Sequence, residues 1–85
     1  MGTLNKKTLA AIERRFPGMK GVVQREFTES DSFRGLCRDY VVCVTALARW
    51  QESESEEGRA RSEEYSELLA ELTEELEARL HAHGA

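Results

Sequence analysis

Two cysteines are the residues of this sequence best suited to chemistry. Cys37 and Cys43 lie six positions apart in a stretch with helical periodicity. On a helix this spacing turns their Cβ atoms to different sides, well beyond the roughly 4 Å that a disulfide requires. The chain has no CxxC motif of the kind used in redox and zinc sites. One cysteine could be a reactive thiol, but both fall on or beside apolar positions, which favours two small buried side chains.

Residue types that bind metals are present without a metal-binding pattern. His81 and His83 are two positions apart, a spacing that does not converge on a helix, and no third ligand is evident. Acidic side chains recur along the last segment: Glu63, Glu67, Glu71, Glu74 and Glu77. Calcium sites need oxygens that converge from a loop, whereas this spacing spreads the carboxylates along a rod. We therefore expect no metal site and no cofactor.

Catalytic signatures are missing as well. The sequence offers no Ser–His–Asp set with suitable surroundings, no glycine-rich phosphate loop and no HExxH motif. No catalytic residue is therefore predicted. A non-enzymatic protein is favoured, and a small enzyme or enzyme subunit is kept as an alternative.

The charge of the chain is unevenly distributed. The net charge is −4, yet the first 27 residues carry an excess of basic side chains: Lys6, Lys7, Arg14, Arg15, Lys20 and Arg25. The rest is acidic, especially residues 52–77. This distribution argues against nucleic-acid binding over the whole surface. It leaves binding through the basic N-terminal segment as an alternative function.

Membrane and targeting signals are not evident. No stretch approaches the roughly 20 apolar residues of a membrane span. Lys6 and Lys7 interrupt what would be the apolar part of a signal peptide. We therefore expect a cytoplasmic protein that does not enter the membrane, with both cysteines as thiols.

The 85 residues suit one domain with a small core. Apolar residues at spacings of three and four predict four helices. A first short helix covers 4–16 and ends at Pro17-Gly18, because proline disfavours helical geometry at the residue before it. A second covers 19–28, where Val22-Val23 leaves a strand or an irregular segment as the alternative.

The clearest pattern predicts a central helix over 32–52. Its apolar seam alternates steps of three and four residues: Phe33, Leu36, Tyr40, Cys43, Leu47 and Trp50. One flank of the seam is apolar too: Cys37, Val41, Val44 and Ala48. The arc covers about half of the helix circumference at about 100° per residue. An arc this wide usually meets neighbours on two sides.

A second long helix is predicted over 59–81, with one apolar face: Tyr65, Leu68, Leu69, Leu72, Leu76 and Leu80. The short acidic link before it forces the two long helices to be antiparallel neighbours. The sequence leaves two starting points for this second long helix. Ser53 and Glu56 match a capping box, which would start the helix near Ser53, whereas the periodic pattern begins at Arg59. The tail 81–85 is expected to fray.

The polar side of the central helix carries a narrow strip of small and apolar residues, Gly35, Val42 and Ala46, flanked by Arg38, Asp39, Thr45 and Arg49. The predicted interaction surface is Gly35, Arg38, Val42, Ala46, Arg49 and Trp50. Small residues let another helix approach closely, so the strip could meet a partner or a second copy. Alternatively, the chain's own N-terminal helices cover it. Trp50 could anchor a partner or close the open end of the hairpin.

One sequence resemblance bears on the fold. The residues Phe33-Arg34-Gly35-Leu36-Cys37-Arg38-Asp39-Tyr40 follow an F-R-x-L-C-x-D-Y pattern, and Leu47-Ala48-Arg49-Trp50 and the glutamate-rich helix from Tyr65 come after it. This resembles a pattern in short uncharacterised bacterial helical proteins and covers about half of the chain. The resemblance implies a helical hairpin and a bacterial origin, and it implies no activity.

Together these patterns predict an all-α fold: an antiparallel hairpin of two long helices with two short N-terminal helices packed on it. Burial of leucines between the long helices would stabilise it, so Leu72→Ala or Leu47→Ala should cost about 2–5 kcal/mol. The sequence does not name a function. It favours a non-enzymatic protein–protein interaction or regulatory module whose partner is another protein or a second copy, as in a homodimer.

Overall fold

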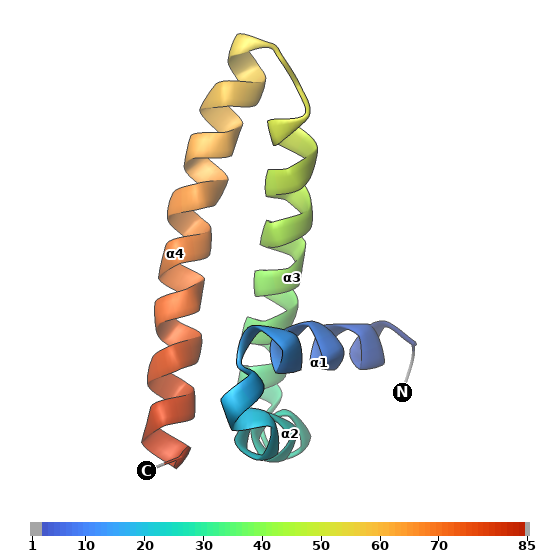
Figure 1. The fold of residues 1–85 in the computed structure, drawn as a ribbon, viewed down its shortest axis with the longest axis vertical. Helices are drawn as coiled ribbons and strands as arrows, with labels where there is room; N and C mark the ends of the chain where they lie inside the picture. The colour runs from blue at the N-terminus through green and yellow to red at the C-terminus, as the bar shows by residue number, and fades with distance from the viewer. Residues whose placement is uncertain (1–2, 85) are drawn as a thin grey trace.

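Helices account for nearly all of the described chain. The computed structural model describes residues 3–84, with side chains from residue 5 to residue 82. In chain order the elements are α1 (Thr3–Arg15), a 3₁₀ turn (Pro17–Met19), α2 (Lys20–Glu29), α3 (Asp31–Gln51) and α4 (Glu56–Gly84) (Figure 1). No β-strand occurs between residues 3 and 84, which confirms the predicted all-α class.

The break between the first two helices occurs at the proline. Phe16 leaves helical geometry with φ −126° and ψ 64°, and Pro17 opens the 3₁₀ turn that leads into α2. The segment around Val22-Val23, for which the sequence left a strand open, is helical. Val23 and Phe27 share one face of α2 and are buried, so packing of this face decides the conformation.

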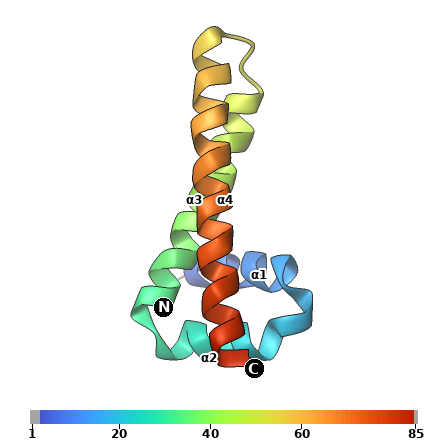
Figure 2. The same cartoon turned by 90° about the vertical axis from the view of Figure 1, so that its left-hand side faces the viewer.

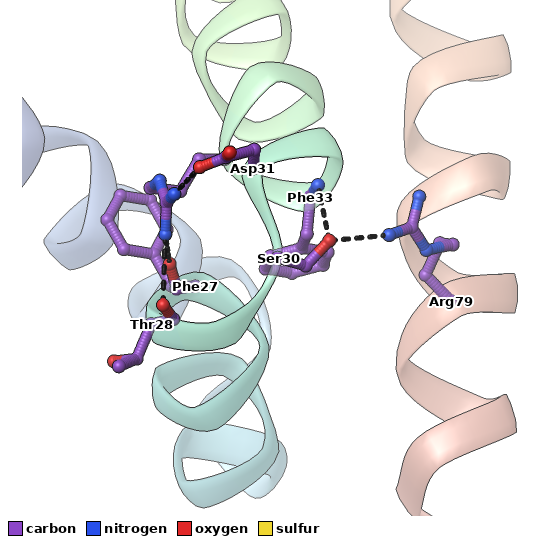
Figure 3. Close-up of polar contacts among 7 residues, drawn as sticks. Phe27, Thr28, Ser30, Asp31, Phe33 and Arg79 are labelled. Atoms are coloured by element: carbon purple, nitrogen blue, oxygen red, sulfur yellow. Dashed lines mark hydrogen bonds and ion pairs between the residues drawn. The ribbon is translucent and has the colours of Figure 1, made fainter.

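Side chains fix the sharp junction between α2 and α3 (Figure 3). Ser30 caps α3, because its Oγ accepts a hydrogen bond from the Phe33 backbone N–H at 3.1 Å. Arg34 donates to the carbonyl oxygens of Phe27 and Thr28, which have no partner within α2. Ser30 therefore supplies a hydrogen-bond partner to the backbone at the start of α3, and Arg34 supplies partners to the backbone at the end of α2.

The two long helices lie side by side and antiparallel (Figure 1), and in the view turned by 90° α4 runs along the front of α3 (Figure 2). The thiol of Cys43 on α3 donates to the carbonyl oxygen of Tyr65 on α4 at 3.3 Å. At the other end of α4, Arg79 reaches the start of α3, where it lies over Phe33 and donates to Ser30 (Figure 3). These contacts fix the register of α3 against α4.

The last helix begins between the two starts that the sequence suggested. Ser55 is its cap, with Oγ accepting from the Gly58 backbone N–H at 3.0 Å, and the helix starts at Glu56. Ser53 supports the cap through its own hydroxyl, 2.9 Å from that of Ser55. Gly58 therefore lies inside the helix. The backbone stays helical to Gly84, beyond the point where fraying was expected, and residue 85 lies outside the described residues.

The hydrophobic core is confined to one end of the hairpin. Its buried members are Ile12, Phe16, Val23, Phe27, Phe33, Cys37, Tyr40, Cys43, Leu72, Leu76 and Leu80. No hydrophobic side chain is buried between residues 44 and 71. We call residues 44–71 the arm, and the rest of the described chain the base. At 13 and 10 residues, α1 and α2 are about 20 and 15 Å long, and they lie at the base instead of along the arm (Figure 1).

Candidate interaction surface

An open groove runs over the arm at the predicted interaction surface. It has a volume of about 480 Å³ and is lined by Val41, Val42, Thr45, Ala46, Arg49, Trp50 and Tyr65. Four of the six predicted surface residues are among these: Val42, Ala46, Arg49 and Trp50. The other two, Arg38 and Gly35, lie one and two turns before Val42 on the same side of α3.

A second hollow of about 200 Å³ continues this groove between α3 and α4. Its lining includes Val42 and Tyr65, which also line the first hollow, and it adds Leu68 on α4. We call the joined apolar surface the arm groove: Val42, Ala46, Trp50, Tyr65 and Leu68. Val42 is 65% exposed and Leu68 is 42% exposed, so the apolar lining faces solvent.

The chain's own N-terminal helices do not cover the predicted interaction surface at Gly35 or at Val42. Val42 is largely exposed, and a Cβ built on Gly35 would meet no atom within 4 Å. The small residue at position 35 therefore makes no close approach to α1, α2 or α4. Trp50 is half-buried at the end of α3.

Sequence reasoning missed the contribution of α4 to this surface. Leu68 and Leu69 were both assigned to the apolar face of the last helix, but adjacent residues point about 100° apart. Leu69 packs against the core cluster, whereas Leu68 is left at the edge of the arm groove. The adjacent pair of leucines was the signal that one of them would be exposed.

The opposite face of the arm is partly covered, unlike the arm groove, because the end of α1 reaches it. A hollow of about 460 Å³ there is lined by Leu47, Leu69 and Ala70 together with Arg15 and Tyr40. Val44 on this face is 40% exposed. The arm groove has no lining residue from α1 or α2, so it is the face open to a large partner.

The charges beside the arm groove differ between its two helices. Arg38 and Arg49 lie four residues before and seven residues after Val42, on the same side of α3. Asp39, three residues before Val42, also lines the second hollow on α3. Around Leu68 on α4 most charged side chains are acidic, namely Glu64, Glu71 and Glu75, but Arg61 lies on the same side and pairs with Glu64 at 3.2 Å. All seven of these charged side chains are exposed. Each side of the groove therefore carries charges of both signs.

The two thiols are buried structural side chains. Cys37 is fully buried, and this burial raises the pKa of its thiol to about 12, although Arg38 and Arg79 act in the opposite direction. Burial also raises the pKa of the Cys43 thiol. A raised pKa lowers the thiolate fraction near neutral pH, and thiolate is the nucleophilic form. This environment does not favour a reactive cysteine.

Other candidate sites have less support. Among the described residues, no group of three or more His, Cys, Asp or Glu side chains could hold a metal ion. The side chain of His83 lies outside the described residues. No helix within residues 3–84 has the length and apolar character needed to cross a membrane.

The basic N-terminal segment is accessible at the base. All six of its basic side chains are exposed: Lys6, Lys7, Arg14, Arg15, Lys20 and Arg25. Arg14 and Arg15 also line a hollow of about 340 Å³ between α1 and α3. Arg15 lies over the ring of Phe16, with its guanidinium carbon 4.9 Å from the ring centroid.

Comparison with known proteins adds no assignment. No family model matches the chain, and the searches of curated proteins and of solved structures found no match. The resemblance to short bacterial helical proteins therefore stays a prediction.

Proposed function

We propose that this protein is a non-enzymatic protein–protein interaction module that binds a helical partner through the arm groove. The partner is another protein or a second copy of the chain. In this proposal the molecule acts as an antiparallel helical hairpin. The two short N-terminal helices pack on its base and leave its arm free for binding.

The observation that carries the proposal is the exposure of Val42, where the base meets the arm, and of Leu68 in the arm, which has no buried core. Two helices cannot enclose apolar side chains on both of their faces, whereas a bundle of four can. Apolar surface gains about 25 cal/mol for each Å² removed from water. A docked helical partner would give the arm the core that it lacks.

The thiols support a reducing setting for this module. Cys37 and Cys43 are free, and the structure holds them apart on one helix. Free cysteines are typical of cytoplasmic proteins, and we propose the cytoplasm as the compartment.

Site-specific photo-crosslinking in cells tests the proposal. A photoreactive amino acid at position 42 should form adducts with a bound protein, which mass spectrometry then identifies. The matched control carries it at position 48, because Ala48 is exposed on the same helix, six residues from Val42, but does not line the arm groove. Equal adduct yields at the two positions, or none at either, would show that the arm groove is not a binding surface.

Nucleic-acid binding through the basic segment of α1 and α2 is a second candidate function, favoured by its exposed lysines and arginines. Phosphate contacts release counterions, so affinity for duplex DNA should fall steeply as salt rises. A gel-shift titration at several salt concentrations would decide, and binding that is absent or indifferent to salt would exclude it.

A further inference from the structure

A hollow between α1 and α3 brings two cationic side chains together with a tyrosine. Arg14 and Arg15, from the last turn of α1, line this hollow of about 340 Å³, and Tyr40 lines it from α3. Val41 and Val44 add apolar surface to the same hollow. Its volume suits a small molecule, since ligand pockets usually measure about 300–1,000 Å³.

The hydroxyl of Tyr40 has no protein partner. The residue is only 9% exposed, yet it forms no hydrogen bond with any residue of the described part of the chain. In that same part, no buried side-chain nitrogen or oxygen lacks a hydrogen-bond partner. The Tyr40 hydroxyl must therefore reach the open space of the hollows that this residue lines. A nearly buried tyrosine usually finds a partner for its hydroxyl, and this one is available to a ligand.

The two arginines also keep their hydrogen-bonding capacity. Within the described residues neither forms an ion pair or a hydrogen bond, and Arg15 only lies over the ring of Phe16. The carboxylate of Glu13 accepts from Gln24 on α2 instead. Glu74 on α4 lines the neighbouring hollow with Arg15 but does not pair with it. The hollow between α1 and α3 has no acidic lining residue.

The hollow lies beside α1 and not at its carbonyl end. Basic residues in a last helical turn also complement the helix dipole, so the position of the two arginines alone would not indicate a ligand. Ala11, one turn earlier, lines the hollow, whereas Phe16 and Pro17 beyond the end of the helix do not. An anion on this side of α1 therefore does not have to face the free carbonyl groups of the last turn.

We propose that this hollow binds a small organic anion, in which an acidic head is joined to a short apolar body. Arg14, Arg15 and the Tyr40 hydroxyl donate to the head, which is a carboxylate or a phosphate. Guanidinium groups bind either head through paired hydrogen bonds. The body covers Val44, which is 40% exposed. This site goes beyond the proposed function, since no residue of the arm groove lines it.

Titrations followed by two-dimensional NMR test the site, with hexanoate as the probe. The signals of Val41 and Val44 should shift saturably, with a dissociation constant on the order of 1 mM for so small a ligand. Hexanol lacks the charge and inorganic phosphate lacks the apolar body, so each should bind about 10-fold or more weakly. Hexyl phosphate in parallel identifies the head, and saturable binding of either anionic probe supports the site.

The comparison probes can also contradict the proposal. Hexanol that binds as tightly as hexanoate would overturn the acidic head. Inorganic phosphate that binds as tightly would overturn the apolar body and favour contact with a nucleic-acid backbone. Absence of saturation with both anionic probes would overturn the site itself and leave the arm groove untouched.

The variant Tyr40→Phe separates a ligand-binding role of the hydroxyl from a structural one. It keeps the ring in the core and removes a hydroxyl that no described residue uses, so the melting temperature of the free protein should change by less than about 2 °C. Binding of hexanoate should weaken by about 10-fold, because a hydrogen bond to a charged group is lost. A lower melting temperature with unchanged binding would show that the hydroxyl serves the fold, which would overturn its proposed role.

A charge-matched pair of variants tests the arginines. Arg14→Gln/Arg15→Gln should weaken hexanoate binding by about 10-fold or more. The control Lys6→Gln/Lys20→Gln removes the same charge from exposed lysines of the same basic segment, outside the hollow, and should change binding by less than about 2-fold. Circular dichroism establishes that both variants keep the helical fold. Equal weakening in the two would show diffuse attraction to the basic segment and overturn the site.

Discussion

The guanidinium of Arg79, near the end of α4, lies over the ring of Phe33 in the first turn of α3, with its central carbon 5.8 Å from the ring centroid. The same group donates to the hydroxyl of Ser32 at 3.0 Å. It also donates to the hydroxyl of Ser30 at 3.2 Å (Figure 3). Ser30 is also the cap of α3. One arginine therefore ties the end of the last helix to the start of the central one.

Replacement of Arg79 should destabilise the fold by about 1–2 kcal/mol. The lost cation–π contact accounts for about 0.5–1 kcal/mol of this, and the lost hydrogen bonds contribute a similar free energy. Arg79→Met keeps an unbranched apolar stem and removes the charge. Urea unfolding followed by circular dichroism measures the change. Arg61→Met is the control, since Arg61 makes only an exposed pair with Glu64 and should cost less than about 0.5 kcal/mol. Equal losses in the two variants would contradict a special role for Arg79.

Truncation of leucines should reveal the division between base and arm. Leu76 is fully buried at the base, so Leu76→Ala should cost about 2–5 kcal/mol. Leu47 in the arm is half-buried beside an open hollow, and its truncation should cost about 1 kcal/mol in the monomer. This revises the larger loss expected for Leu47 from the sequence. Urea unfolding at concentrations that keep the protein monomeric compares the two, and similar losses would show that the arm has a core of its own.

The helical class could be predicted because the apolar residues repeat at intervals of three and four. Phe33, Tyr40 and Cys43 followed this pattern, and all three are buried. Leu47 followed it equally well but is half exposed. Periodicity identifies the face of a helix that can be buried. It does not say how far along the helix a neighbour extends.

The candidate surface was accessible to sequence reasoning only on one of its helices. The strip around Val42 is visible on α3 because small and apolar residues interrupt its polar side. Leu68 could not be assigned to that surface, because its exposure depends on which of two adjacent leucines faces α3. The start of α4 was missed for a related reason. The cap uses Ser55 with support from Ser53, so two serines share the role that a capping box gives to one.

Two glycines inside helices should respond in opposite ways to substitution by alanine. A Cβ at Gly58 would lie 2.7 Å from the Cβ of Ser53 and 2.9 Å from its backbone oxygen, so the connection would have to move. Gly58→Ala should therefore lose about 1–3 kcal/mol of stability. A Cβ at Gly35 meets nothing within 4 Å, and Gly35→Ala should gain about 0.5–1 kcal/mol from helix propensity.

Thermal melts of the two glycine variants beside the parent test this contrast directly. Gly35 serves as the control for Gly58, because both substitutions change a helical glycine in the same way. An increase in stability for Gly58→Ala would mean that the tight contact with Ser53 does not constrain the start of α4.

The buried thiol of Cys37 should make the fold less stable at alkaline pH. Burial raises its pKa from 9.0 to about 12, against the lowering effects of Arg38 and Arg79. Well below pH 9.0 the thiol keeps its proton in both the folded and the unfolded chain, so its contribution is constant. Between 9.0 and about 12 the unfolded chain loses the proton while the folded one retains it. The free energy of unfolding must then fall as pH rises.

Comparison with Cys37→Ala isolates this effect, because every other side chain is common to the two proteins and only the Cys37 thiol is removed. The alanine variant loses packing at every pH, so it should be less stable than the parent at pH 8. The difference should shrink steadily from pH 9 to pH 10.5, as the parent alone loses the thiol contribution. Chemical denaturation across this range measures it. Two curves that stay parallel would mean that Cys37 ionises as readily in the folded chain as in the unfolded one.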